Sequence, residues 1–144
     1  METMTQKDKE LLLKDLCARL PYGVKFVCNK NVYTAKGLDL IVTDEGDWEY
    51  AVTAKGIAPI EIDFIKPYLF PLSSMTEEQK KEYNYWKHEV PVCRYEYGDV
   101  VEEIELYDSP ESFEYLIENH FDYRGLIPMG LAEDATDKNI YDYL

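Results

Sequence analysis

The sequence predicts an α+β protein with an N-terminal helix, a four- to five-stranded antiparallel small-barrel-like sheet, and C-terminal helices with a possible extra hairpin. Two observations predict it. The apolar period changes from helical to alternating at Val24, and the proline-bounded stretch 65–76 separates strand-like segments from helix-like ones. A chain of 144 residues suits one domain. We expect a single compact domain, with a helix and an antiparallel sheet or barrel in residues 1–66 and an acidic, mostly helical extension in residues 67–144.

The first helix should begin after Thr5, a favourable N-cap, and end at Pro21 and Gly23. Charged residues lie off its apolar stripe. The stripe is formed by Leu12, Leu13, Leu16, Cys17 and Leu20.

Residues 24–65 alternate between apolar and polar side chains and are divided by turn sequences. They predict an antiparallel meander, in which residues 32–43 form two strands or one long strand bent at Gly37. The order of parts resembles that of small Sm-like barrels in topology alone. Residues 24–65 lack the Asp-x-x-x-Asn and Arg-Gly signatures with which Sm-like proteins hold RNA, so RNA binding is not implied.

Pro67 and Pro71 should let the chain leave the sheet as a stiff arm. Thr76 followed by Gln79 predicts a capping box at the start of a helix over residues 77–87.

Residues 92–97 and 100–107 predict a hairpin about Gly98-Asp99. Ser109 followed by Pro110 predicts a last helix. Its buried stripe is expected at Phe113, Leu116, Ile117 and His120. Residues 121–132 could add a further helical turn or two, and the acidic tail could either dock through Ile140, Tyr141 and Tyr143 or stay mobile.

The net charge is −14, and the last fifty residues hold two basic groups against fourteen acidic ones. Such a field opposes direct binding to nucleic acid or to an anionic membrane and favours a basic protein partner; a merely solvated surface is the alternative. Cys17, Cys28 and Cys93 are widely spaced and odd in number, which favours a cytoplasmic protein with buried thiols. No stretch is long and apolar enough to act as a signal peptide or to span a bilayer.

The sequence predicts no catalytic residues, no metal site and no cofactor, because it lacks a nucleophile elbow, a phosphate loop and metal-ligand spacing. An enzyme would need a deep pocket with convergent polar groups.

Candidate binding residues are instead of the types enriched in interfaces. They are Tyr68, Phe70, Tyr123, Arg124 and Met129. Each has a structural alternative: the aromatic arm could be a strap over the barrel mouth, and Arg124 could pair with Asp122 or a nearby carboxylate while its neighbours cover the sheet.

Three stretches, 15–25, 66–78 and 120–132, resemble an uncharacterised protein family of gut bacteria and their phages. The resemblance implies a cytoplasmic protein encoded by a phage or mobile element, and it implies no catalytic residues, because that family has no assigned activity. Two functions follow as hypotheses. One is a non-enzymatic protein-interaction module, and the alternative is an acidic nucleic-acid mimic that occupies a DNA-binding protein.

Overall fold

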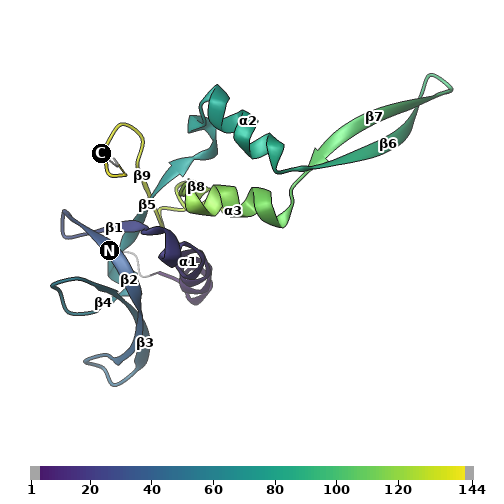
Figure 1. The fold of residues 1–144 in the computed structure, drawn as a ribbon. Helices are drawn as coiled ribbons and strands as arrows, with labels where there is room; N and C mark the ends of the chain where they lie inside the picture. The colour runs from purple at the N-terminus through teal and green to yellow at the C-terminus, as the bar shows by residue number, and fades with distance from the viewer. Residues whose placement is uncertain (1–3, 142–144) are drawn as a thin grey trace.

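A computed structural model describes residues 4–141, and it confirms an α+β fold (Figure 1). The helices are α1 (Gln6–Arg19), α2 (Glu77–Tyr85) and α3 (Pro110–Glu118), with short 3₁₀ turns η1 (Leu20–Tyr22), η2 (Ile62–Phe64) and η3 (Leu72–Ser74). The strands are β1 (Lys25–Cys28), β2 (Asn31–Val42), β3 (Trp48–Ala54), β4 (Ile60–Glu61), β5 (Lys66–Pro71), β6 (His88–Glu96), β7 (Asp99–Tyr107), β8 (Phe121–Asp122) and β9 (Glu133–Asp134).

Helix α1 begins as predicted, because the Thr5 side chain accepts a hydrogen bond from the Asp8 amide at 3.1 Å. Its buried face differs from the expected stripe. Leu12 and Leu16 are fully buried, but so are the charged Asp15 and Arg19. Cys17 is exposed, which corrects the expectation that it is a core thiol.

The main sheet has the strand order β4-β3-β2-β1-β5-β8, and β9 also pairs with β5. It is open: β4 and β8 lie at opposite ends of this order, so the sheet does not close into a barrel. Strand β2 is one long strand with a register shift between Ala35 and Gly37. A Cβ at Gly37 would lie 3.3 Å from Thr53 Oγ1, so the bend brings two backbones close together.

The segment with Pro67 and Pro71, which was expected to form an arm, is strand β5. It does not leave the sheet but lies inside it, antiparallel to β1 and parallel to β8 and β9. Pro67 lies in this strand opposite Phe26, and the short ladder between β1 and β5 is completed by a side chain. The Lys25 amide donates to the Tyr141 hydroxyl at 2.7 Å, which in turn donates to the Tyr68 carbonyl at 2.8 Å. The acidic tail therefore docks through Tyr141, while Tyr143 lies outside the described residues.

Two hydrophobic cores meet at β5. Leu69 belongs to the larger core between α1 and the sheet. Phe70 packs against the smaller core, formed by Met75, Tyr115, Leu116 and Phe121 under α2 and α3. Strand β5 therefore contributes to both cores and connects the two halves of the chain.

The expectation that residues 67–144 are mostly helical is wrong. Helices α2 and α3 form with the predicted capping residues Thr76 and Ser109, but α2 ends at Tyr85 and more residues lie in strands than in helices. The predicted hairpin is real and longer than expected. Residues 121–132 contain β8 and turns instead of a helix, because the Asp122 carboxylate accepts the amides of Leu126 and Ile127 and so holds a tight loop.

The buried stripe of α3 also differs from the prediction. Leu116 and His120 are buried, whereas Phe113 is 41% exposed. Tyr115 and Ser112 are buried in its place. Polar capping contacts and the stacking of Tyr115 on Tyr83 thus set the face that α3 buries.

Candidate interaction surfaces

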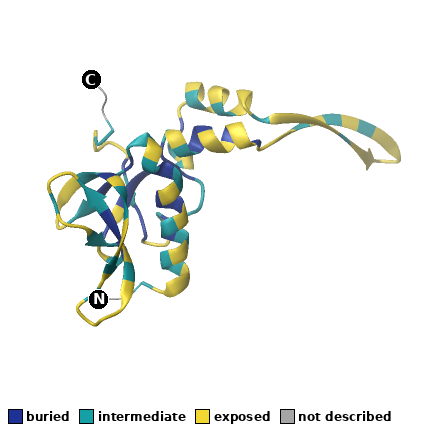
Figure 2. Cartoon of the chain, turned by 60° about the horizontal axis from the view of Figure 1, so that its bottom comes forward, coloured by how far each residue is buried: buried dark blue, intermediate teal, exposed yellow. Residues whose placement is uncertain are grey.

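The β6–β7 hairpin projects from the molecule beyond α2 and α3 (Figure 1). Among residues 4–141, β6 and β7 pair only with each other. No side chain of residues 88–107 is buried, and the ribbon shows only intermediate and exposed residues (Figure 2). An isolated two-stranded hairpin is only marginally stable in water. A projecting ribbon of this length is therefore unusual in a protein that has no binding partner for it.

One face of this ribbon is mainly apolar. Directly paired residues share a face and alternate along each strand. The register therefore places Pro91 with Ile104, and Tyr95 with Val100, on the same side. We call Pro91, Tyr95, Val100, Ile104 and Leu106 the hairpin face. Ile104 is 68% exposed and Tyr95 is 81% exposed, and exposed apolar side chains gathered in one patch mark interaction sites.

The base of the hairpin is fixed to both helices that carry it. The Ser109 hydroxyl donates to the Trp86 carbonyl, and the Tyr83 hydroxyl donates to the Asp108 carboxylate. Burial and the hydrogen bond to Asp108 raise the pKa of the Tyr83 hydroxyl well above its usual value. These bonds close the ends of the hairpin against α2 and α3, so its direction is set by the body of the protein.

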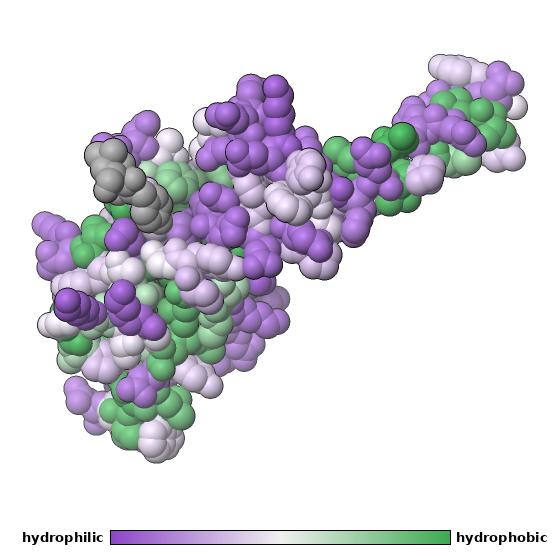
Figure 3. Space-filling model, viewed as in Figure 1, coloured by the Kyte–Doolittle hydropathy of each residue, from purple (hydrophilic) through white to green (hydrophobic). Residues whose placement is uncertain are grey.

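A second exposed apolar surface lies on β2 and β3. The register pairs Leu40 with Tyr50 and Val42 with Trp48 on one face, and all four are about half exposed or more. We call these four residues the tip patch. Figure 3 shows hydrophobic surface both on the hairpin and at the lower end of the molecule near β3. Unlike the strands of the hairpin, the strands of the tip patch belong to the main sheet.

Carboxylates gather along one face of α3. Glu111, Glu114 and Glu118 are exposed, recur at helical spacing and line one shallow groove of ≈ 180 Å³ with Trp86 and Tyr115. We call the three carboxylates the α3 ridge. The Tyr22 hydroxyl donates to Glu114, which holds the middle carboxylate of the ridge in place.

The predicted aromatic pair on β5 lies inward. Tyr68 is 8% exposed, with the Lys138 ammonium 5.7 Å from its ring centroid. Phe70 is half-buried, and its ring lies 6.2 Å from that of Phe121 and 5.8 Å from that of Tyr141. Neither lies on an exposed arm as predicted, because β5 is an inner strand.

Tyr123 and Arg124 lie beside a buried ion pair that the sequence did not reveal. Arg19 Nε donates to Asp15 Oδ2 at 2.8 Å, and both side chains are fully buried. Arg124 Nε lies 3.4 Å from Asp15 Oδ1, within ion-pair distance but without hydrogen-bond geometry. Both guanidinium groups lie over the Tyr123 ring, with Arg19 Cζ 5.8 Å and Arg124 Cζ 4.9 Å from the ring centroid. Arg124 thus pairs with a carboxylate of α1 instead of Asp122.

Met129, the last predicted binding residue, lies against α1. It is 48% exposed and lines a shallow groove with Leu11 and Lys14. The five predicted residues therefore do not form one surface. None of the five predicted residues lies on the exposed hairpin. Its alternating apolar and acidic residues predict a hairpin, but they do not show that the rest of the chain leaves both of its faces exposed.

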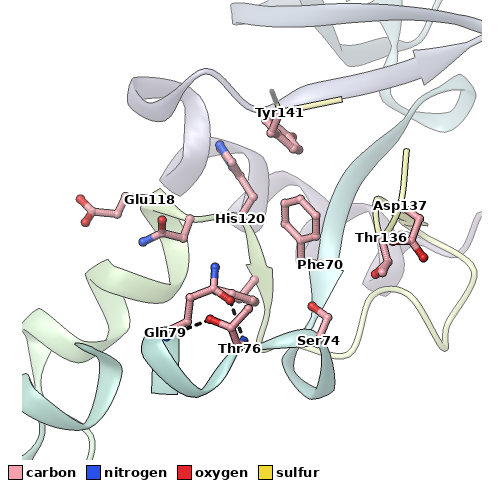
Figure 4. A pocket seen from close by; sticks show the side chains of 11 residues that line it. Phe70, Ser74, Thr76, Gln79, Glu118, His120, Thr136, Asp137 and Tyr141 are labelled. Atoms are coloured by element: carbon pink, nitrogen blue, oxygen red, sulfur yellow. Dashed lines mark hydrogen bonds between the residues drawn. The ribbon is translucent and has the colours of Figure 1, made fainter. Parts of the chain in front are cut away.

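A cavity of ≈ 380 Å³ lies between the start of α2, the end of α3 and the C-terminal tail (Figure 4). Its wall includes Phe70, Ser74, His120 and Tyr141, and the His120 ring stacks on that of Tyr141 at 4.2 Å. His120 is buried with φ +62°, and neither ring nitrogen makes a hydrogen bond of normal geometry. Burial, with a smaller contribution from Arg19, lowers the pKa of His120 to about 4, although the nearby Tyr22 carbonyl opposes the shift. The cavity therefore contains a neutral imidazole whose nitrogens face the protein interior.

Within the described part of the chain, no three His, Cys, Asp or Glu residues are arranged to hold a metal ion. Over the same residues, no helix is both long enough and apolar enough to cross a membrane.

Comparison with known proteins adds no relative: no family model matches the chain, no curated protein is similar to it, and no solved structure matches it.

Proposed function

We propose that this chain is a non-enzymatic protein-interaction module that meets its partner through the β6–β7 hairpin. The observation that supports this is a 20-residue projection, residues 88–107, which buries no side chain and still carries five exposed apolar side chains on one face. Such a ribbon gains little stability from the rest of the fold. Binding a partner would cover the hairpin face and stabilise the ribbon at the same time.

Charge favours a basic partner. The hairpin carries six acidic residues and one basic residue, Arg94. Opposite charges on a partner would steer the encounter and exclude acidic proteins and nucleic acid.

We place the protein in the cytoplasm, which the free thiols of Cys17, Cys28 and Cys93 support. The resemblance of three stretches to a family of gut bacteria and their phages supports an origin in a phage or mobile element.

The test is removal of the hairpin. In the register, His88 and Tyr107 are directly paired, so residues 89–106 can be replaced by Asn-Gly, which forms a two-residue turn. We expect the full chain to capture a protein from its host cells and the shortened chain to lose it. The matched control is a tip-patch variant, Trp48→Ser with Tyr50→Ser, which should still capture that protein. Equal capture by the shortened chain would contradict the proposal.

A second candidate function is an acidic nucleic-acid mimic, and the α3 ridge is the observation that favours it. Its carboxylates lie three and four residues apart, which is ~4.5 and ~6 Å along the helix axis. Such a row could occupy the basic groove of a DNA-binding protein. In that case binding should weaken steeply with salt, be competed by duplex DNA, and be lost when Glu111, Glu114 and Glu118 are replaced by glutamine. Binding that survives these substitutions and resists DNA would exclude this function.

A further inference from the structure

The two edges of the hairpin differ in their free hydrogen-bonding groups. Tyr97 and Gly98 both have positive φ, +51° and +85°, as a two-residue type I′ turn requires. Such a turn makes the flanking pair, Glu96 and Asp99, a hydrogen-bonded pair. Because hydrogen-bonded and non-hydrogen-bonded pairs alternate, every second pair from Tyr95–Val100 onward points its backbone groups away from the ribbon.

On β6 the outward positions include Pro91, which has no N–H to offer. This proline blunts that edge, as proline does on natural edge strands. On β7 the outward positions each keep an N–H and a C=O. They are Val100, Glu102, Ile104 and Leu106. The β7 edge is therefore an uninterrupted template for another strand, whereas the β6 edge is not.

The side chains along β7 specify which strand would fit. Three of the four outward positions are apolar and belong to the hairpin face, namely Val100, Ile104 and Leu106, and Glu102 lies among them on the same face. The alternate positions place Glu103 and Glu105 on the opposite face. A strand added at this edge would present its own side chains beside them. It should therefore be apolar on one face and carry lysine or arginine on the other.

We infer that β7 binds an extended, basic segment of the partner by strand addition, with the partner's apolar side chains on the hairpin face and its cationic side chains beside Glu103 and Glu105. This inference rests on the proposed function, because it names the partner's chemistry at the same element. It gives the acidic hairpin a specific role, since main-chain hydrogen bonds supply affinity and alternate side chains supply specificity.

A second copy of this chain is the disfavoured occupant. Pairing β7 with β7 across a two-fold axis would bring Glu102, Glu103 and Glu105 of both copies together. Like charges directly opposite each other destabilise a sheet.

The probe is a nonapeptide with blocked ends that alternates lysine and valine. Its binding is followed by amide hydrogen exchange of the full chain. We expect the amides of Val100, Glu102, Ile104 and Leu106 to exchange about tenfold more slowly at a peptide concentration ten times Kd. The matched control peptide has the same composition with its valines contiguous, and it should give no such protection. Protection of the β6 amides, or none with the alternating peptide, would overturn the inference.

A pair of proline substitutions tests the same edge. Cys93 and Glu102 are directly opposite each other, so Cys93→Pro and Glu102→Pro each remove one outward N–H at the same level of the ribbon. We expect Glu102→Pro to weaken peptide binding at least tenfold and Cys93→Pro to leave it unchanged. Glu102→Gln separates the loss of the charge from the loss of the N–H and should bind nearly as well as the wild type. Equal effects of the two prolines would contradict strand addition at β7.

Two further outcomes separate this inference from the proposed function. If the hairpin is needed for capture from host cells but neither proline nor peptide has the expected effect, then the hairpin binds by a face and only the strand-addition mode fails. A concentration-dependent dimer that is lost in Glu102→Pro would show that a second copy occupies the edge, which overturns the basic partner. The exchange measurement uses the unaltered chain, so it decides the question even if a proline variant does not fold.

Discussion

The Asp15 carboxylate and the Arg19 guanidinium tie α1 to the C-terminal half of the chain. Arg19 donates to Asp15 and also to the carbonyl of Phe121, which precedes the loop that carries Arg124. A fully buried charge is costly unless it is paired and hydrogen-bonded. This small network therefore fixes how α1, α3 and the loop after β8 fit together.

Asp15→Asn should destabilise the fold by about 3 to 5 kcal/mol, because it leaves two buried or half-buried guanidinium groups without their counter-charge. Urea unfolding followed by tryptophan fluorescence measures this change. Cys17→Ala on the exposed side of the same helix is the control, with an expected change within about 0.5 kcal/mol. A similar effect of both substitutions would show that the ion pair does not hold the fold together.

His120 should make the fold sensitive to mild acid. Its pKa is about 4 in the folded chain against the ordinary value of 6.5, so the unfolded state binds more protons between these values. Stability is therefore complete above about pH 6.5 and decreases as the pH falls toward 4. We expect a loss of about 2 kcal/mol between pH 7 and pH 5.

His120→Asn isolates this effect, because asparagine tolerates the positive φ at this position and does not titrate. Urea unfolding at several pH values should show a smaller decrease for the variant across the same window. If the variant and the wild type lose stability in parallel, His120 is not the titrating group.

The Tyr141 hydroxyl bridges β1 and β5, so removing this hydroxyl should destabilise the pairing of these two strands. Tyr141→Phe leaves the Lys25 amide and the Tyr68 carbonyl without their bridge, at an expected cost of about 1 to 3 kcal/mol. Hydrogen exchange at the Lys25 amide should become faster. Tyr107→Phe, which removes an exposed hydrogen bond to Glu105, is the matched control and should change little. Unchanged exchange at Lys25 would contradict the bridging role.

At the scale of elements, the sequence predicts where helices and turns begin better than it predicts which strands pair with each other. The cap residues Thr5, Thr76 and Ser109 act locally, and all three helices begin where these residues predict. The inner position of β5 could not be predicted, because its pairing depends on β8 and β9, which lie fifty or more residues further along the chain. Each of those strands has only two residues, too few for a recognisable period.

The hairpin should also be the least protected strand pair in the protein. Strands β6 and β7 are exposed on both faces, whereas β1 contributes the fully buried Phe26 to the larger core. We expect the free energy of local opening, measured by native-state hydrogen exchange, to be at least ~2 kcal/mol lower for β6–β7 amides than for β1–β2 amides. Identical opening energies would indicate that the hairpin unfolds only with the whole protein, and would remove the reason to expect a stabilising partner.

At the scale of the whole molecule, a body with two hydrophobic cores carries an exposed arm, the β6–β7 hairpin. Helix α1 and the open sheet form the larger core, β5 joins it to the smaller one, and α2 and α3 aim the hairpin outward. The sequence could predict an acidic α+β protein with surplus charge at its C-terminal end. It could not predict which surface is exposed. Whether residues such as Tyr95 and Ile104 are exposed depends on how the other elements pack, which local sequence patterns do not show.

The most direct test that the hairpin is the interaction element is site-specific photo-crosslinking in the host cell. A photoreactive amino acid replaces Ile104 on the hairpin face in one variant and Trp48 on the tip patch in another; both side chains are about two-thirds exposed. We predict a discrete crosslinked partner from position 104 and none from position 48. A partner trapped only from position 48 would contradict the assignment of the hairpin as the interaction element.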